Sequence, residues 1–225
     1  MATYYVDFNN KTDRVWTMAV YQTLPNSTGL DSVSWLQGSA APGGQIGVKF
    51  DLTFNVALAN YSSDGGRGVY KASQLLPADL GTAWKVVYEN GVQQLKAAGQ
   101  APQGDQILIT NDSNKIANPG IGMSGSGSVF KQNVNGGASA QFQVTPSYYI
   151  GLFNDVQKGE VISSNVIVGP KNLKYPTGET QATVTADLDG SNIVLHIEYG
   201  STTSVSLAEV DTRLAFADFQ RSRQR

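Results

Sequence analysis

The chain has 225 residues, which is enough for one large all-β domain or two small domains, and 40% of them are hydrophobic. Only 15% are charged and the formal net charge is −2, so the sequence lacks the dense basic face of a nucleic-acid-binding protein. It has no cysteine and one histidine, which excludes disulfides and thiolate chemistry and leaves little material for histidine-based catalysis or metal binding.

The first residues, 1–7, have neither the basic region nor the apolar region of a secretion signal. Nowhere does an apolar run approach the roughly 18 residues that a membrane-spanning helix requires. We therefore expect no transmembrane segment and no nucleic-acid partner. We also expect a protein that stays in the cytoplasm or leaves the cell by a non-classical route.

Strand patterns begin at the N-terminus and recur along the chain. Tyr4, Val6 and Phe8 alternate with other side chains before a turn-forming stretch, which is the period-2 pattern of a half-buried strand. Asn90-Gly91, between two strand-like runs, predicts a hairpin with a type I′ turn. Further short runs rich in β-branched or aromatic residues lie at 48–52, 54–58, 84–88, 106–109, 142–144 and 193–197. These patterns predict an all-β fold class with antiparallel sheets.

Three blocks of sequence recur in the same order, which predicts an internal duplication. Asn10, for example, corresponds to Asn111 at an offset of 101. The blocks are 6–20 with 107–121 at an offset of 101, 43–60 with 137–154 at an offset of 94, and 84–95 with 184–195 at an offset near 100. We therefore predict two tandem antiparallel β-sandwich domains of similar topology, at residues 1–103 and 104–200.

The last stretch, residues 201–225, differs in character from the rest. Its composition favours a helix over 207–219, with Ser206 as the N-cap and Glu209 three residues later, as in a capping box. The helix folds back on its own β-domains, frays as a chain end, or docks on a neighbouring molecule. The residues expected to make the docking contact are Leu207, Val210, Leu214, Phe216 and Phe219.

Two motifs resemble sites of known chemistry but do not have the right surroundings. Gly120-Ile121-Gly122-Met123-Ser124-Gly125 matches the glycine-rich dinucleotide fingerprint, yet the next residues predict another strand and not the helix that the motif needs. His196 and Glu198 share one face of a predicted strand, but no nucleophile accompanies them.

A third motif lies in a predicted hairpin turn. Asp187, Asp189 and Asn192 carry oxygens that suit Ca²⁺, but they lack the EF-hand spacing and a bidentate glutamate, so an ordinary turn is favoured. We therefore predict no catalytic residue, no cofactor and no metal site, and a protein that is not an enzyme. Paired carboxylates, which suffice for glycoside hydrolysis, are the main exception to that reasoning.

Low net charge and open sheet edges make self-association physically easy. The sequence therefore favours a non-enzymatic structural or interaction protein that assembles with itself, as a homo-oligomer or filament, through its sandwich surfaces and its C-terminal helix. One alternative is a carbohydrate-binding, lectin-like module, because the doublets Tyr4-Tyr5 and Tyr148-Tyr149 each direct one ring outward, where it could stack on a sugar. A second alternative is a membrane-lytic β protein that exposes an apolar edge.

Overall fold

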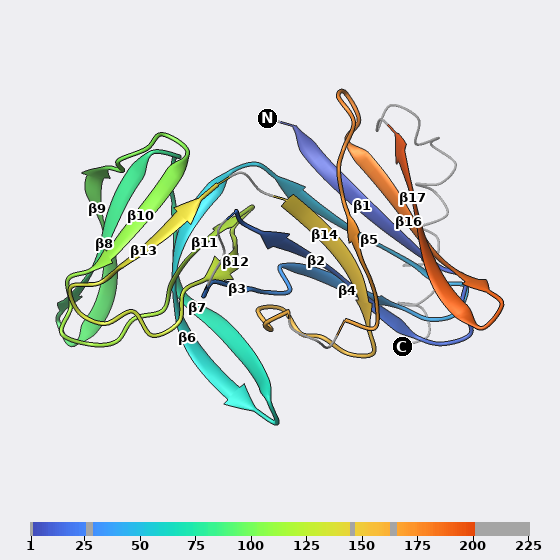
Figure 1. Ribbon diagram of the computed structural model, residues 1–225, viewed down its shortest axis with the longest axis horizontal. Coiled ribbons are helices and arrows are strands. Elements are labelled where there is room, and N and C mark those ends of the chain that lie inside the picture. Colours follow the sequence, from blue (N-terminus) through green and yellow to red (C-terminus); the bar gives the residue numbers. More distant parts are fainter. Residues whose placement is uncertain (1, 26–28, 145–146, 163–165, 201–225) are drawn as a thin grey trace, which may run out of the picture.

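The computed structural model describes residues 2–25, 29–144, 147–162 and 166–200, and within them every regular element is a β-strand. The predicted all-β fold is thereby confirmed. The helix predicted over 207–219, with all its docking residues, lies outside the described residues. The strands form four sheets, which pack in pairs around two main hydrophobic cores (Figure 1).

The first sandwich is the right-hand unit in Figure 1. Its strands are β1 (Thr3–Asn10), β2 (Trp16–Thr23), β4 (Leu36–Ala40), β5 (Gln45–Asp51), β14 (Ser147–Phe153), β15 (Val168–Asn172), β16 (Gln181–Asp189) and β17 (Asn192–Gly200). One sheet has the order β17-β16-β1-β5 and the facing sheet has the order β15-β14-β2-β4. Phe8 from one sheet and Trp16 and Leu152 from the other meet in the core between them.

The second sandwich is the left-hand unit. Its strands are β3 (Asp31–Ser32), β6 (Phe54–Asp64), β7 (Arg67–Pro77), β8 (Thr82–Glu89), β9 (Val92–Gln100), β10 (Gln106–Asn111), β11 (Pro119–Met123), β12 (Ser126–Phe130) and β13 (Ser139–Gln143). The sheets have the orders β13-β10-β8-β9 and β3-β12-β11-β6-β7. Ile107 and Phe142 from the first of these sheets pack with Val56 from the second.

Strand β1 shows how the sequence pattern produces a sheet with one buried face. Val6 and Phe8 are fully buried, because alternate side chains of a strand point the same way and here they enter the core. Asp7, between them, lies on the other face, where its Oδ2 accepts a hydrogen bond from Gln181 Nε2 at 2.7 Å. The same β1 therefore supplies core packing on one side and a polar surface on the other.

The predicted hairpin at Asn90-Gly91 is confirmed. Glu89 and Val92 are paired across the turn, and both Asn90 and Gly91 have positive φ angles, of 52° and 81°. A type I′ turn requires positive φ angles at two successive residues, and asparagine and glycine adopt such angles at little energetic cost.

The strands are divided between the sandwiches differently from the prediction. Residues 1–51 and 147–200 build the first sandwich, whereas 54–143 with β3 build the second. The predicted boundary near residue 103 does not match the sheets, because β8 pairs with β10 across it. That pairing is parallel, as is β1 with β16, so the sheets that contain β1 and β8 are mixed, whereas the other two sheets are antiparallel as predicted. The period-2 pattern fixes which face of a strand is buried, but it does not select the partner strand.

The long β6–β7 hairpin extends from the second sandwich (Figure 1), and it is anchored to a loop of the first. Arg67 donates a bidentate pair of hydrogen bonds to Glu160, from Nε to Oε1 at 2.8 Å and from Nη2 to Oε2 at 2.5 Å. Its Nη1 also donates to Asp155 Oδ2 at 3.1 Å, and Tyr70 N donates to Gly159 O at 2.9 Å. The two sandwiches are therefore connected by an ion pair as well as by the chain.

Candidate functional site

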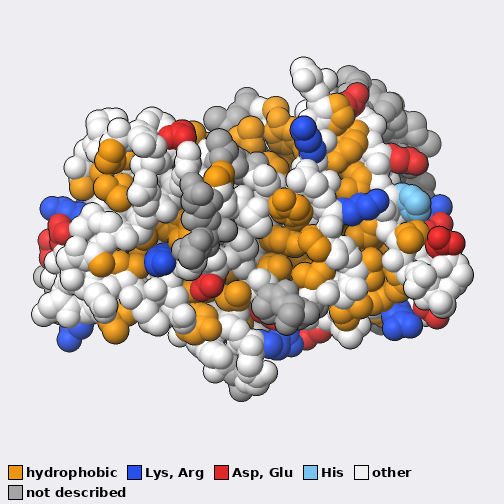
Figure 2. Space-filling model, viewed as in Figure 1, with side chains coloured by type: hydrophobic (Ala, Val, Ile, Leu, Met, Phe, Trp, Pro, Cys, Tyr) orange, Lys and Arg blue, Asp and Glu red, His pale blue; other side chains and the backbone are white. Residues whose placement is uncertain are grey.

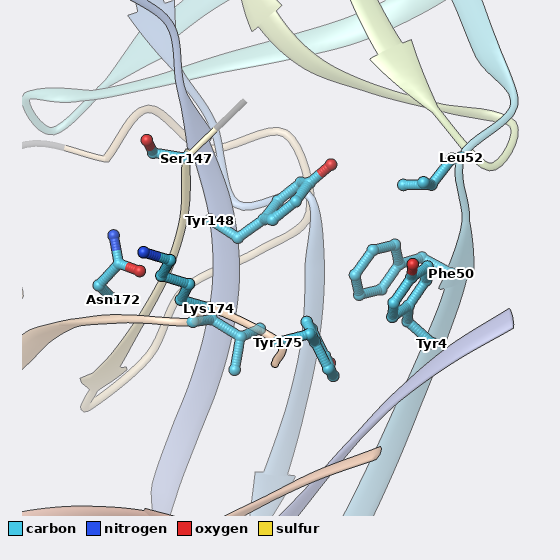
Figure 3. Close-up of a pocket in the computed structure, with 9 residues that line it drawn as sticks. Tyr4, Phe50, Leu52, Ser147, Tyr148, Asn172, Lys174 and Tyr175 are labelled. Carbon is cyan, nitrogen blue, oxygen red and sulfur yellow. The ribbon is translucent and has the colours of Figure 1, made fainter. Parts of the chain in front are cut away.

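A pocket of about 520 Å³ opens at one end of the first sandwich, and we call it the aromatic pocket (Figure 3). Its volume falls within the range of about 300–1,000 Å³ that is usual for small-molecule sites. The residues that line it are Tyr4, Phe50, Leu52, Ser147, Tyr148, Asn172, Leu173, Lys174 and Tyr175. They come from the start of β1, the end of β5 and the residue after it, the start of β14, and the end of β15 with the segment that follows it.

Four rings form a packed cluster around the pocket. Phe50 stacks on Tyr4 with ring centroids 5.4 Å apart, and its ring lies 5.5 Å from that of Tyr148. Tyr175 meets Tyr4 edge to face at 4.9 Å. Beneath them lies Trp35, fully buried and 5.0 Å from Phe50. Such aromatic pairs hold one another in position, so the walls of the pocket are formed before any ligand enters.

Polar groups occupy one side of the pocket and apolar groups the other. Figure 3 shows Ser147, Asn172 and Lys174 together on one side, with Leu52 and Phe50 across from them. Tyr148 extends its ring over the space between the two sides. This is the usual design of a small-molecule site, in which apolar surface provides affinity and a few polar atoms fix orientation.

The hydroxyls of Tyr148 and Tyr175 at the pocket remain protonated at neutral pH. Burial raises the pKa of both Tyr148 and Tyr175 above the usual tyrosine value, because it disfavours the charged phenolate. The Tyr175 hydroxyl donates to the backbone oxygen of Tyr5 at 2.9 Å, and the Tyr148 hydroxyl lies 3.6 Å from the sulfur of Met123. Lys174 is the one charged residue among those that line the pocket in the described part of the chain.

The second sandwich contributes to the wall behind the pocket. Met123, at the end of β11, packs into the core of the first sandwich. Its carbonyl oxygen accepts a hydrogen bond from Trp35 Nε1 at 3.1 Å. Ser124, in the following turn, accepts at its Oγ a hydrogen bond from Asp51 N at 3.4 Å. The pocket therefore lies beside the place where the chain passes from one sandwich to the other.

The structure places the three oxygen-bearing residues that the sequence singled out at one hairpin turn. Asp187, Asp189 and Asn192 lie at the β16–β17 turn, where Asp189 and Asn192 are paired across the strands and Asp187 Oδ1 accepts a hydrogen bond from Leu188 N at 2.8 Å. No group of three or more His, Asp or Glu side chains suited to a metal ion occurs in the described ranges. An ordinary hairpin turn accounts for this motif.

The other two motifs also have structural roles. The segment that matches the dinucleotide fingerprint forms most of β11 and the tight turn that leads into β12, so a strand follows it and not the helix on which a pyrophosphate would sit. Gly122 is required there by close packing, because a Cβ at this position would lie 1.8 Å from the backbone oxygen of Ser126. His196 is exposed on β17 opposite Thr185, two residues from the exposed Glu198.

Sequence reasoning singled out two tyrosine doublets but did not predict the aromatic pocket. The doublets 4–5 and 148–149 do place their two rings on opposite faces, but Tyr4 and Tyr148 are the members that line the pocket. Tyr149 instead stacks on Tyr21, at 5.8 Å, away from it. Tyr175 was missed, because it lies in an irregular segment with no strand pattern.

The surface of the molecule carries few charges. Figure 2 shows scattered charged side chains, with hydrophobic side chains gathered over the first sandwich in this view. Among the described residues, no helix is both long enough and apolar enough to cross a membrane.

Comparison with known proteins places the chain in a family. The sequence model of the family described as RhiA matches residues 1–196. Protein RhiA of Rhizobium leguminosarum bv. viciae is 27% identical over 199 residues, an alignment that covers 77% of this chain and 78% of that protein. No solved structure gave a significant match. Because the family match extends over most of its length, the chain belongs to the RhiA family.

Proposed function

We propose that this protein is a non-enzymatic carbohydrate-binding protein and that the aromatic pocket is its binding site. The observation that carries the proposal is the combination of three tyrosines and a phenylalanine around an open pocket with hydroxyl, amide and ammonium groups on one side. Sugars have apolar C–H faces and a rim of hydroxyls, so they suit a site that offers ring faces together with hydrogen-bonding groups.

The polar groups favour a sugar over a strongly charged or wholly apolar ligand. Asn172 provides a donor and an acceptor, Ser147 provides a hydroxyl that can do either, and Lys174 donates. No carboxylate is among the described lining residues, and the hydroxyls of Tyr148 and Tyr175 are neutral. A neutral or weakly acidic saccharide matches this set.

We also infer that the chain consists of two repeats, 1–103 and 104–200, which exchange halves between the sandwiches. The first half of each repeat is completed by the second half of the other. Strand pairing supports this interpretation, because equivalent strands have equivalent partners at the offsets that relate the sequence blocks. The partners are Val6 with Val48 and Ala182 in the first sandwich, and Ile107 with Phe142 and Thr82 in the second.

Two buried asparagines give independent support for the duplication. Asn10 ends β1 and its Nδ2 donates to two backbone carbonyls at 2.8 and 2.9 Å, while Asn111 ends β10 and donates to two at 2.8 Å. Each Oδ1 accepts from the backbone N–H two residues later, at 3.1 and 3.0 Å. The carbonyl acceptors are those of Arg14 and Ala40 for Asn10, and of Lys115 and Val134 for Asn111.

If the two repeats are equivalent, the end of the second sandwich that corresponds to the aromatic pocket can be compared with the pocket itself, residue by residue. At the offsets of the repeats, Tyr4 corresponds to Asp105, Phe50 to Val144 and Tyr148 to Phe54. The equivalent end of the second sandwich therefore lacks this set of tyrosines, although β1 and β10 have equivalent strand partners. The tyrosines at this end are thus a feature of one sandwich and not a requirement of the fold.

The test is glycan binding by the full-length protein, first on a glycan array and then by calorimetry with the best saccharide. Tyr148→Ala should weaken binding at least about tenfold, or about 1.4 kcal/mol, because it removes the ring that spans the pocket. Tyr149→Ala is the matched control, since it truncates the neighbouring ring on the opposite face. Lys174→Ala, which removes an exposed side chain, should also weaken binding without affecting the core.

The proposal is wrong if the wild-type protein binds no glycan, or if Tyr148→Ala and Tyr149→Ala weaken binding equally. Thermal unfolding of each variant separates loss of the pocket from loss of the fold.

Self-association is a second candidate function, and the arrangement of the strands favours it. The two segments that build the first sandwich lie on either side of the second in the chain.

A further inference from the structure

We propose that a second copy of this chain is a partner, and that two copies associate by exchanging the halves of the first sandwich. Residues 1–51 of one molecule would pair with residues 147–200 of the other, and the reverse. This goes beyond the proposed sugar binding and does not depend on it.

The first sandwich is held together by contacts between its two segments. Strand β1 of the N-terminal segment pairs with β16, and β2 pairs with β14, so each sheet contains strands from both segments. The core is shared in the same way, with Phe8 and Trp16 from one segment packed with Ile150 and Val184 from the other. Neither segment has a complete sheet or core of its own.

The second sandwich, by contrast, is almost entirely one continuous segment, 54–143. In sequence it lies between the two segments of the first sandwich. Residues 1–51 contribute to it the two-residue strand β3 and side chains such as Leu24 and Val33, whereas its other eight strands come from 54–143, so we infer that most of it stays folded when residues 1–51 detach. A molecule in which residues 1–51 have detached therefore keeps one folded unit and displays an open half-sandwich. The surface on that half-sandwich fits the N-terminal segment of an identical chain.

The connections between the sandwiches are short. Only Leu52 and Thr53 separate β5 from β6, and residues 144–146 separate β13 from β14. Short connections favour exchange between molecules, because a short connection restrains the strands that it joins from pairing within one molecule. Those strands can instead pair with the equivalent strands of a second molecule. Described residues that flank the two connections lie close together, since Phe50 and Tyr148 are in ring contact at 5.5 Å.

Exchange between two molecules costs little free energy. An exchanged pair makes the same ladders and the same core contacts as a single molecule, so the main cost is the entropy of association, which high concentration offsets. With a net charge of −2 and 15% charged residues, two copies repel each other little. Head-to-tail exchange can also continue from molecule to molecule, which gives chains as well as dimers.

The experiment uses two full-length single variants, and it is clean because the chain has no cysteine. Asn9 and Thr185 are partners across the β1–β16 ladder. Asn9→Cys and Thr185→Cys are mixed, refolded together at high concentration, oxidised and separated on a non-reducing denaturing gel. A disulfide between them joins two molecules and can form at this register only if residues 1–51 of one molecule pair with residues 147–200 of the other.

The matched control mixes Thr185→Cys with His196→Cys. These residues are also partners, across β16–β17, but both lie in the same exchanged segment. Exchange keeps them on one chain, so the control mixture should give only background dimer. We expect the first mixture to give covalent dimer at several times the control level, rising with protein concentration. Equal amounts of dimer in the two mixtures, at every concentration, would overturn the proposal.

Discussion

The ion pair at the end of the β6–β7 hairpin allows a quantitative prediction about how the sandwiches are held together. Glu160 is 1% exposed, and Arg67 bonds both of its carboxylate oxygens. Gln157 N also donates to Glu160 Oε2, at 3.1 Å. Arg67→Ala removes the guanidinium and leaves a carboxylate in a site that was arranged around a positive charge.

The expected loss follows from the burial of the two partners. Breaking a fully buried ion pair from one side costs about 3–5 kcal/mol. The side chain of Arg67 is 42% exposed, so in the Arg67→Ala variant water partly replaces the guanidinium. We therefore expect the free energy of unfolding to fall by about 2–3 kcal/mol. For a chain of this size that corresponds to a decrease in Tm of about 4–12 °C.

The control for this prediction is the second carboxylate bonded by Arg67. The Asp155 side chain is 78% exposed, so Asp155→Ala should cost no more than about 1 kcal/mol. The measurements are thermal and urea unfolding followed by circular dichroism. In a double-mutant cycle, adding Glu160→Gln to Arg67→Ala should recover part of the loss, because it removes the buried charge. If Arg67→Ala and Asp155→Ala destabilise the protein equally, the reasoning about Glu160 is refuted.

Three further predictions concern other parts of the fold. Asn10→Ala and Asn111→Ala should each lower the free energy of unfolding in urea by about 2–4 kcal/mol, because each leaves two backbone carbonyl groups without their hydrogen-bond donor. The two losses should agree within about 1 kcal/mol, because the two asparagines bond the same kinds of groups. Gly122→Ala should cost about 2–3 kcal/mol or more, because its Cβ would collide with a carbonyl of β12, whereas Gly104→Ala, which has open space, should change stability by less than about 0.5 kcal/mol. Burial, aided by the neighbouring Tyr149, raises the pKa of Tyr21 to about 12, so the folded state retains a proton that the unfolded chain loses near its ordinary value of 10.0. Stability should therefore fall as pH rises from about 10 to 12, and an ultraviolet titration of phenolate should show this tyrosine ionising late.

The sequence predicted the local features of the fold well, for reasons visible in individual residues. Val6 and Phe8 alternate with polar neighbours and are buried as expected. Asn90 and Gly91 accept positive φ angles and form the expected turn. Both the burial of alternate side chains and the turn depend on residues that are close together in sequence, so a short stretch of sequence is enough to predict them.

The pairing of strands could not be predicted in the same way. Strands β8 and β16 have similar patterns, so β1 has two equally suitable partners as far as its own sequence shows. Its partner in the structure is β16, beyond the whole second sandwich. The choice depends on connections such as 52–53 and on packing between distant segments, which no local pattern reports.

The aromatic pocket illustrates the same limit. The doublets at 4–5 and 148–149 marked tyrosines of interest, but only the fold brings Tyr4 and Tyr148 to the same cavity. Tyr175 joins them from a segment that carries no strand pattern. The pocket is made by segments that are far apart in the chain, so it can be located only once the strand topology is known.

The place of β1 in its sheet also determines how the protein responds to mechanical tension. Tyr5 lies opposite Gln181, and Gln181 lies opposite Gly200, so the start of β1 and the end of β17 emerge at the same end of one sheet. A force applied between residues 3 and 200 therefore opens the sheet from that end, one hydrogen-bonded pair after another. Strands loaded in this way separate like a zipper at low force, whereas strands pulled from opposite ends must break all their bonds together.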